Sequence, residues 1–197
     1  MADKDITSFR DYTVPELPGC PLSIVDQAIM ETLREFFHRT QYWQEDLTAI
    51  DVVAAQTEYE LDPSSSNSEI DAVVTVEQDG SELEAGVDYK LDDTKKLLVL
   101  NNEPDAASTG GLEVKVALKP RLTATRIPER MFNDWVYQIA AGVKGKLMAL
   151  PKMKWTDQQM AVFYFDKFEG GVAEACWESK RGRTNKTITV RATYAFA

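Results

Sequence analysis

Few residues in this chain could carry out chemistry. His38 is the single histidine among 197 residues, and Cys20 and Cys176 are the only cysteines. With one histidine, serine and cysteine triads and most transition-metal sites are nearly excluded. His38 follows an apolar helical pattern, and a cation there would favour a helix C-terminus, so we expect a structural role. The cysteines form no CxxC pair, and we expect both to be reduced and packed, with a redox role as the alternative.

Carboxylates offer a second candidate chemistry. The stretch YELDPSSSNSEID contains Asp62, Glu69 and Asp71, and glycosidases and calcium sites both use such groups. The spacing lacks the D-x-[DN]-x-[DN]-G order that folds around calcium, so we expect a solvated loop instead. The chain also lacks GxxxxGK[ST], GxGxxG after a strand, and HExxH. We therefore expect no catalytic residue, no cofactor and no metal, and hence no enzyme.

Charge is unevenly distributed along the chain, whose net charge is -10. Residues 1–127 carry 25 acidic and 11 basic side chains, a balance of -14, whereas residues 180–197 carry five basic and no acidic ones. An acidic body argues against wrapping nucleic acid, because duplex binding relies on lysine and arginine displacing counterions from phosphates. The basic end alone is suited to an anionic partner.

Neither a membrane span nor a signal peptide is indicated. No apolar run approaches the roughly 18 residues that a transmembrane helix needs. The N-terminus MADKDITSFRDY lacks the basic and then apolar pattern of a signal peptide. With 44% hydrophobic residues, the chain can build a normal packed core. We expect a soluble protein without membrane contact that resides in a cytoplasm.

The elements that must position any site follow the order helix, β-module, helix, helix and tail. Hydrophobic spacing predicts a helix that starts at Pro21 or Ser23 and ends at about Trp43, and two later helices over residues 128–150 and 156–180. Two pairs resemble capping boxes: Ser23 with Asp26, and Thr156 with Gln159. Between the helices, a period of two predicts about six antiparallel strands, with exposed loops at residues 62–69 and 101–111.

The predicted fold class is α+β. One N-terminal helix packs with two C-terminal helices as a helical body, an antiparallel β-sandwich or barrel module is inserted between them, and an extended arm ends the chain. The predicted boundaries are residues 1–46 for the N-terminal segment and helix, 47–122 for the β-module, 123–180 for the rest of the helical body, and 181–197 for the arm.

Aromatic residues exceed what a three-helix layer needs. The third predicted helix, with the runs MAVFYFDKF and ACWESK, places large side chains on more than one face. A helix that is apolar on several sides is either central or shared with a neighbouring subunit. Both interpretations stay open, and the second points to an oligomer.

The final segment RGRTNKTITVRATYAFA has the alternation of a strand and no neighbouring strand to pair with. Ordering the backbone of residues 184–197 costs on the order of 14 to 28 kcal/mol, at about 1 to 2 kcal/mol for each residue. The segment must therefore add to the protein's own sheet or lie on another chain by strand addition. The residues expected to make its contacts are Arg181, Arg183, Lys186, Ile188, Val190, Arg191, Tyr194 and Phe196.

Two stretches resemble the head-to-tail adaptor (connector, head-completion) proteins of tailed bacteriophages. The first is PELPGCPLSIVDQAIMETLREFFHRTQYWQEDL, which is similar to the opening of these proteins. The second is RIPERMFNDWVYQIAAGVKGKLMALP, which resembles the helix after their β-module. The residues that match the first pattern and its continuation are Ala28, Arg34, Glu35, Phe36, Phe37, Arg39, Thr40, Trp43, Leu47, Ile50, Val52, Val53, Ala54, Tyr59, Leu61 and Pro63.

The resemblance implies a structural protein of the virion. Such proteins form a ring, usually a dodecamer, beneath the portal; the helices build the ring, the β-module faces downstream tail or nozzle proteins, and the C-terminal arm docks on the portal. The expected location is the neck of the virion, and the host cytoplasm during assembly. We further expect acidic side chains to line the channel, so that viral DNA passes without specific binding.

Two other functions remain open from the sequence. One is another neck or tail-tube protein, in which the C-terminal segment joins sibling subunits instead of the portal. The other is a glycan-binding or host-binding β-module carried on helices, with the loops at residues 62–69 and 101–111 as its tips.

Overall fold

The computed structural model describes residues 2–181. It contains α-helices and antiparallel sheets, so the predicted α+β class is confirmed at that level. The helices are α1 (Arg10–Thr13), α2 (Leu22–Thr40), α3 (Glu129–Met148) and α4 (Gln158–Lys180), with 3₁₀ turns at Ile6–Phe9 and Val14–Glu16. The strands are β1 (Asp3–Asp5), β2 (Gln44–Asp46), β3 (Ile50–Val52), β4 (Glu58–Glu60), β5 (Ser68–Gln78), β6 (Ser81–Glu82), β7 (Tyr89–Leu91), β8 (Leu97–Leu100), β9 (Ser108–Pro120) and β10 (Arg126–Pro128).

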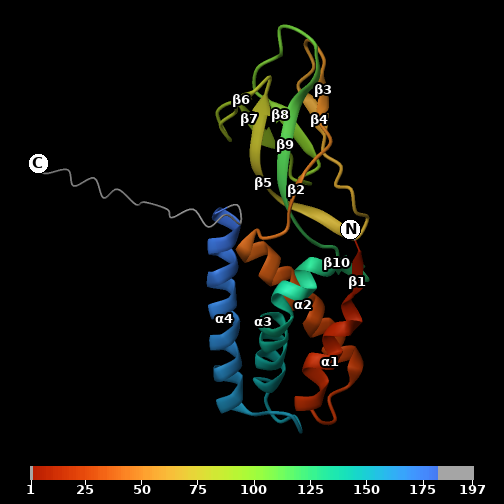
Figure 1. Cartoon of the computed structure of the whole chain (residues 1–197), viewed down its shortest axis with the longest axis vertical. Coiled ribbons are helices and arrows are strands. Elements are labelled where there is room, and N and C mark those ends of the chain that lie inside the picture. Colours follow the sequence, from red (N-terminus) through yellow and green to blue (C-terminus); the bar gives the residue numbers. More distant parts are fainter. Residues whose placement is uncertain (1, 182–197) are drawn as a thin grey trace, which may run out of the picture.

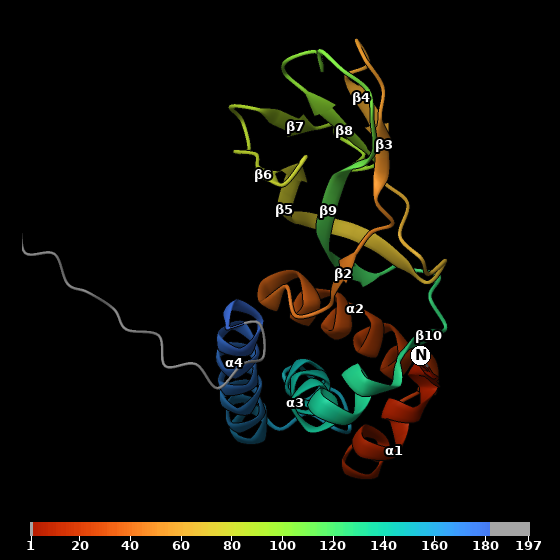
Figure 2. The ribbon, with the colours of Figure 1, turned by 45° about the horizontal axis from the view of Figure 1, so that its top comes forward.

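The helices lie at one end of the molecule and most strands at the other (Figure 1). In both ribbon views α3 lies between α4 on one side and α1 on the other, while α2 crosses beneath the sheet (Figure 2). Phe36 of α2 joins the three long helices, since its ring lies 5.5 Å from that of Trp135 in α3 and 6.2 Å from that of Phe168 in α4. Aromatic pairs at these separations stabilise the contact beyond the apolar area that they bury.

The largest sheet is built on the long strands β5 and β9. Its order is β2-β9-β5-β6, with β3 also pairing β9, and every pair is antiparallel. A three-stranded sheet has the order β4-β8-β7, and β1 pairs with β10 beside the helices. The prediction of about six strands between the helices was therefore too low, because short strands such as β6 give no periodic signal.

The first predicted helix was about three residues too long. The helix ends at Thr40, because Gln41 takes a left-handed conformation with φ of 48° and its amide donates to the carbonyl of Phe37. This is a C-terminal cap, which stops the helix although Trp43 continues the apolar spacing. Residues 44–46 then form β2, so the sheet starts before residue 47.

Neither predicted capping box forms. The N-cap of α4 is Asp157, whose carboxylate accepts from the amides of Gln159 and Met160, while Thr156 donates its hydroxyl to the carbonyl of Leu150. Asp26 pairs with Arg10 at 2.5 Å and does not cap its own helix. The pair connects the N-terminal segment to α2.

Within residues 2–181, no helix combines the length and the apolar character that crossing a bilayer requires.

Candidate functional site

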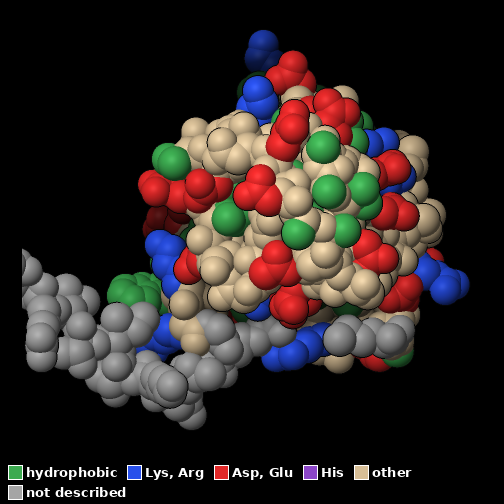
Figure 3. All heavy atoms as spheres, turned by 90° about the horizontal axis from the view of Figure 1, so that it is seen from above, with side chains coloured by type: hydrophobic (Ala, Val, Ile, Leu, Met, Phe, Trp, Pro, Cys, Tyr) green, Lys and Arg blue, Asp and Glu red, His purple; other side chains and the backbone are tan. Residues whose placement is uncertain are grey.

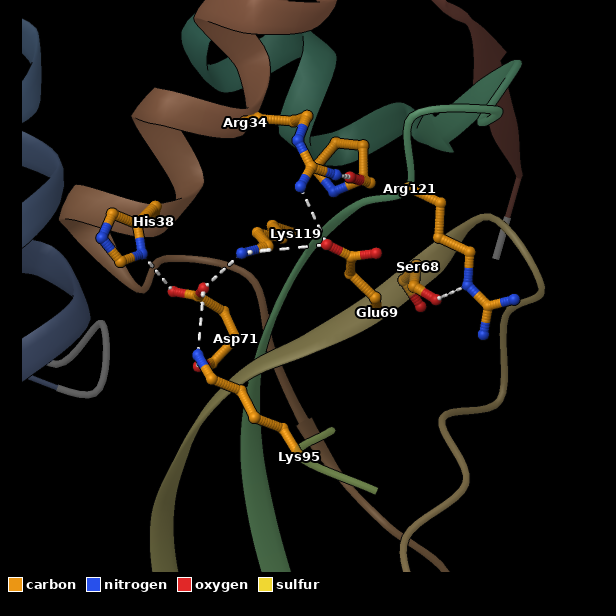
Figure 4. A network of polar contacts seen from close by, with 9 residues as sticks. Arg34, His38, Ser68, Glu69, Asp71, Lys95, Lys119 and Arg121 are labelled. Carbon is orange, nitrogen blue, oxygen red and sulfur yellow. Dashed lines mark hydrogen bonds and ion pairs between the residues drawn. The ribbon is translucent and has the colours of Figure 1, made fainter. Parts of the chain in front are cut away.

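A network of charged side chains joins α2 to the main sheet (Figure 4). Its centre is Asp71 in β5, whose side chain is 2% exposed. The Nδ1 atom of His38 lies 2.8 Å from one carboxylate oxygen, and Nζ of Lys119 in β9 donates to the other at 2.8 Å. Lys95, in the turn between β7 and β8, donates to the backbone carbonyl of Asp71. Its Nζ also lies 3.8 Å from the carboxylate, so the Asp71 side chain contacts a helix, the main sheet and a turn of the three-stranded sheet.

The same network continues toward the N-terminal half of α2. Arg34 donates to Glu69 at 2.9 Å and also to the backbone carbonyl of Pro120. Arg121 donates through Nε to the carbonyl of Ser68 at 2.7 Å. Because Arg34 bonds both β5 and the end of β9, it fixes the axis of α2 across the two longest strands.

The environment of Asp71 keeps its carboxylate charged. Burial opposes ionisation, but the hydrogen bonds from Lys119 and His38 outweigh it and hold the pKa of Asp71 below its usual value of 3.8. The prediction of a solvated loop was therefore wrong for Glu69 and Asp71, which lie in β5, and holds for the exposed Asp62. The partners of Asp71 come from α2, β9 and the turn before β8, so the arrangement positions the sheet.

A second charged cluster ties the N-terminal segment to the helices. Lys144 of α3 is buried, donates to Glu16 at 2.8 Å, and lies 4.3 Å from the ring centre of Tyr164 in α4. The hydroxyl of Tyr164 donates to the other oxygen of Glu16. Burial, followed by the Glu16 carboxylate, raises the pKa of Tyr164 to about 12. This cluster also connects structural elements, because the charge of Lys144 is balanced by that of Glu16 and the hydroxyl of Tyr164 is hydrogen-bonded.

The cysteines lie apart, and neither forms a disulfide. Cys176 is half-buried with its Sγ 3.4 Å from the carbonyl of Arg39. Burial raises the pKa of the Cys20 thiol, which lowers its reactivity. Among residues 2–181, no three histidine, cysteine, aspartate or glutamate side chains are placed to hold a metal ion.

Exposed apolar side chains gather on two faces of the helices. On α4, Val162 is 61% exposed, Phe163 46% and Trp177 56%. On the other side of α3, Tyr137 is 71% exposed and packs edge-on against Tyr12 of α1, with ring centres 5.5 Å apart. We name these the α4 face (Met160, Val162, Phe163 and Trp177) and the tyrosine face (Tyr12 and Tyr137). Aromatic residues on a surface mark interaction sites when they cluster.

The sheet end of the molecule is acidic. Residues 50–119 contain sixteen acidic residues and five lysines, a balance of -11. Viewed from above the sheet, carboxylates are spread over the whole exposed end (Figure 3). This end repels polyanions and attracts basic segments.

Of the predicted arm residues, the structure describes Arg181 alone, whose guanidinium lies 5.3 Å from the ring centre of Trp177. The other predicted contact residues lie outside the described residues: Arg183, Lys186, Ile188, Val190, Arg191, Tyr194 and Phe196.

The charged network was missed by the sequence predictions. The available signal was Asp71 within a β-branched run, between Ile70 and Ala72, where a carboxylate in a strand needs a cation. Its partners come from residues 33 and 48 positions away, and no local pattern connects them. No protein-family model matches the chain, and no curated protein matches it either.

Proposed function

We propose that this chain is a structural subunit that assembles into a ring at the head-to-tail junction of a tailed bacteriophage. The observation that carries the proposal is the pair of exposed apolar faces on opposite sides of α3. A subunit with two different apolar faces can bind one face to the other face of the next copy. Such heterologous contacts close into a ring when the rotation between copies is suitable.

The α4 face is shaped for packing against another surface. Phe163 and Trp177 lie about 21 Å apart along the helix axis, at 1.5 Å for each residue. Between them Gly170 is exposed, and beyond its own turns of α4 no described atom lies within 4 Å of where its Cβ would be. Small residues between two aromatic ones leave a groove that a neighbour's side chains can fill.

The tyrosine face supplies the complementary surface. Since α1 and α4 lie on opposite sides of α3 (Figure 2), the two faces of one copy cannot contact each other. They can meet only between copies. Tyrosine suits such an interface, because its ring buries apolar area while its hydroxyl stays hydrogen-bonded.

The two charged clusters support a rigid subunit. The network around Asp71 holds the sheet on α2, and the Glu16 cluster holds the N-terminal segment on α3 and α4. We therefore propose that the helices act as one body in the ring, with the strands as a sandwich-like module on it. The acidic sheet end suits a channel that passes DNA without binding it, because carboxylates repel phosphates.

The ring subunit would lie in the neck of the virion, below the portal and above tail or nozzle proteins, with twelve copies as the number that the resemblance suggests. The prediction that residues 181–197 bind the portal stays a prediction, and its alternative is that the segment joins sibling subunits. The second candidate, another neck or tail-tube ring, shares the same two faces and differs only in its neighbours.

The test is the state of the full-length protein in solution and by electron microscopy. We expect mass to increase with concentration in sedimentation velocity, and closed rings in negative-stain images. A monomer at every concentration, or a two-fold dimer that does not grow, would contradict the proposal, because a two-fold contact uses one face twice.

A further inference from the structure

The unpaired edge of β2 opens into a cleft between the sheet and the helices. The cleft has a volume of about 720 Å³. Its base includes the buried side chains of Trp43 and Met131, and one wall is the serine-rich loop at residues 64–67. The opposite wall comes from β1, β10 and the start of α3. The cleft thus lies at the junction of the two ends of the molecule.

The backbone of β2 is available on this side. The carbonyl of Trp43 accepts from Leu118, and the amide of Leu47 donates to Val114, so residues 43 and 47 bond β9. In an antiparallel pair the bonding direction alternates along the strand. The backbone groups of Gln44 and Asp46 therefore point away from β9, into the cleft. Within residues 2–181, β2 pairs with β9 alone, and an unpaired edge is a template for a further strand.

The walls carry a net negative charge. Four carboxylates line the cleft, with Arg130 as the one cation among them: Asp3, Glu45, Asp46 and Asp62. Asp46 pairs with Lys115 at 3.2 Å, and Glu45 accepts the amide of Ser64 at 2.9 Å. Arg130 lies 3.5 Å from Asp134 on its own helix. In the described part of the chain, Asp3 and Asp62 form no ion pair, so both carboxylates can pair with cations of a bound segment.

A strand edge between acidic walls fits a basic, extended segment. Residues 182–197 carry Arg183, Lys186 and Arg191, no acidic side chain, and alternating apolar residues. We propose that the cleft receives the C-terminal segment of a second copy, which adds as a strand to β2 while its cations face Asp3 and Asp62. Main-chain hydrogen bonds would give affinity, and the charges would give specificity.

The position of the end of α4 favours a second copy, and not the same chain, as the source of the segment in the cleft. Ser179 donates to the carbonyl of Gln41, and Gln44 donates to Ser179, so the end of α4 lies at the N-terminal end of β2. A segment running directly from there along its own β2 would pair in parallel. Every strand pair in this sheet is antiparallel, and parallel pairing is slightly less stable. A neighbour's segment can enter from the other end.

The proposed ring brings the two parts together, and the inference rests on that proposal. When the α4 face of one copy packs on the tyrosine face of the next, the end of α4 lies on the side of the neighbour that carries β1 and β10, which line the cleft. Each bound segment would raise the effective concentration of the next contact, so that weak pairs give a firm ring.

Cross-linking in the full-length chain tests this arrangement. Two proteins are made in a Cys20→Ser, Cys176→Ser background: a tagged one with Thr48→Cys in the cleft, and an untagged one with Thr189→Cys. We expect a disulfide between the tagged and untagged chains after mild oxidation. Asp3→Asn with Asp62→Asn should lower its yield about tenfold, and so should Thr189→Cys combined with Val190→Pro, which removes a backbone donor. Asp105→Asn, in an exposed loop outside the cleft, is the matched control.

The outcomes separate this inference from the ring proposal. Rings that form without the cross-link would overturn the cleft assignment and leave the ring proposal intact. The same conclusion would follow if only portal protein bound residues 182–197. The cross-link without rings would support the cleft pairing and contradict the ring. A disulfide formed only within one chain that carries both cysteines would show that the segment lies in its own cleft, and would overturn the exchange between copies.

Discussion

His38 Nδ1 lies 2.8 Å from the carboxylate of Asp71, and this contact connects the last turn of α2 to β5, near the start of its pairing with β9. The two residues differ in exposure, since the His38 side chain is 65% exposed and that of Asp71 is 2% exposed. Losing the contact therefore costs more free energy at the buried Asp71 than at the exposed His38, because only Asp71 is removed from water. Lys119 completes the arrangement from β9.

Asp71→Asn should destabilise the fold by about 2 kcal/mol, because charged hydrogen bonds contribute about 1.5 to 3 kcal/mol each and the amide retains part of them. Urea unfolding of the variant and the wild type measures the difference. Asp105→Asn, on an exposed loop, should change the free energy of unfolding by less than about 0.5 kcal/mol. Equal effects of the two substitutions would show that the Asp71 network does not hold the sheet.

The cost of Asp71→Asn should depend on pH. The pKa of Asp71 is lowered from 3.8, so its contribution is present above that value and is lost as pH falls through the lower, folded-state pKa. We expect a full difference in the free energy of unfolding at neutral pH and a shrinking one below pH 3.8. Urea unfolding repeated over this range checks it. A difference that grows on acidification has the wrong sign for this mechanism.

Two glycines should respond oppositely to alanine. A Cβ at Gly142 would lie 2.6 Å from Cδ2 of Phe168 and 2.7 Å from Cγ2 of Thr32. At Gly170, by contrast, no described atom beyond the neighbouring turns of α4 lies within 4 Å of a Cβ. Gly142→Ala should therefore cost about 1 to 3 kcal/mol by overpacking, and Gly170→Ala should stabilise α4 by up to about 1 kcal/mol. Thermal and urea unfolding compare them. The packing of α2, α3 and α4 would need revision if Gly142→Ala were neutral.

The phenol of Tyr164 should lose its proton at a higher pH than an ordinary tyrosine does. Its pKa is about 12 because of burial and then the Glu16 carboxylate. Removing that charge in Glu16→Gln should move the pKa back toward 10.0, and the stability that comes from the neutral phenol should fade above pH 10.0 in the wild type. Tyrosinate absorbance, with Tyr164→Phe to identify the late component, measures it. An unchanged late component in Glu16→Gln would rule out the contact.

The α4 face should control assembly and leave folding unchanged. Phe163→Glu with Trp177→Glu adds charge at two exposed positions, so circular dichroism should match the wild type. Self-association should weaken at least about 30-fold, since a central aromatic contributes about 2 kcal/mol or more to an interface. Val87→Glu is the control, because Val87 is 60% exposed near β7, away from both faces. Sedimentation velocity would refute the assignment if both variants assembled alike.

The sequence predicted the elements whose signals are local. The apolar spacing of Val25, Ile29, Leu33 and Phe36 identified α2, and all four are fully buried. The strand alternation identified β9, which spans residues 108–120. Such patterns are reliable because one face of a helix or strand must meet the core, whatever the partner is.

The ends of elements were less predictable. Gln41 ends α2 through its left-handed backbone, and Asp157 in place of Thr156 caps α4. Each of these helix ends depends on which of several adjacent residues takes a particular backbone conformation. The free energies of neighbouring candidate positions differ by less than about 1 kcal/mol.

The sequence alone determined the class of fold, the main helices and strands, the uneven charge and the lack of a familiar catalytic motif, because each follows from composition or from spacing within one element. Only the tertiary structure decided that Asp71 is buried beside His38 and Lys119, that α4 and α1, which carry exposed apolar side chains, lie on opposite sides of α3, and that β2 has a free edge in an acidic cleft. These relationships join residues that are distant in the chain. They contribute to stability only after the elements have packed together, so no local pattern in the sequence reports them.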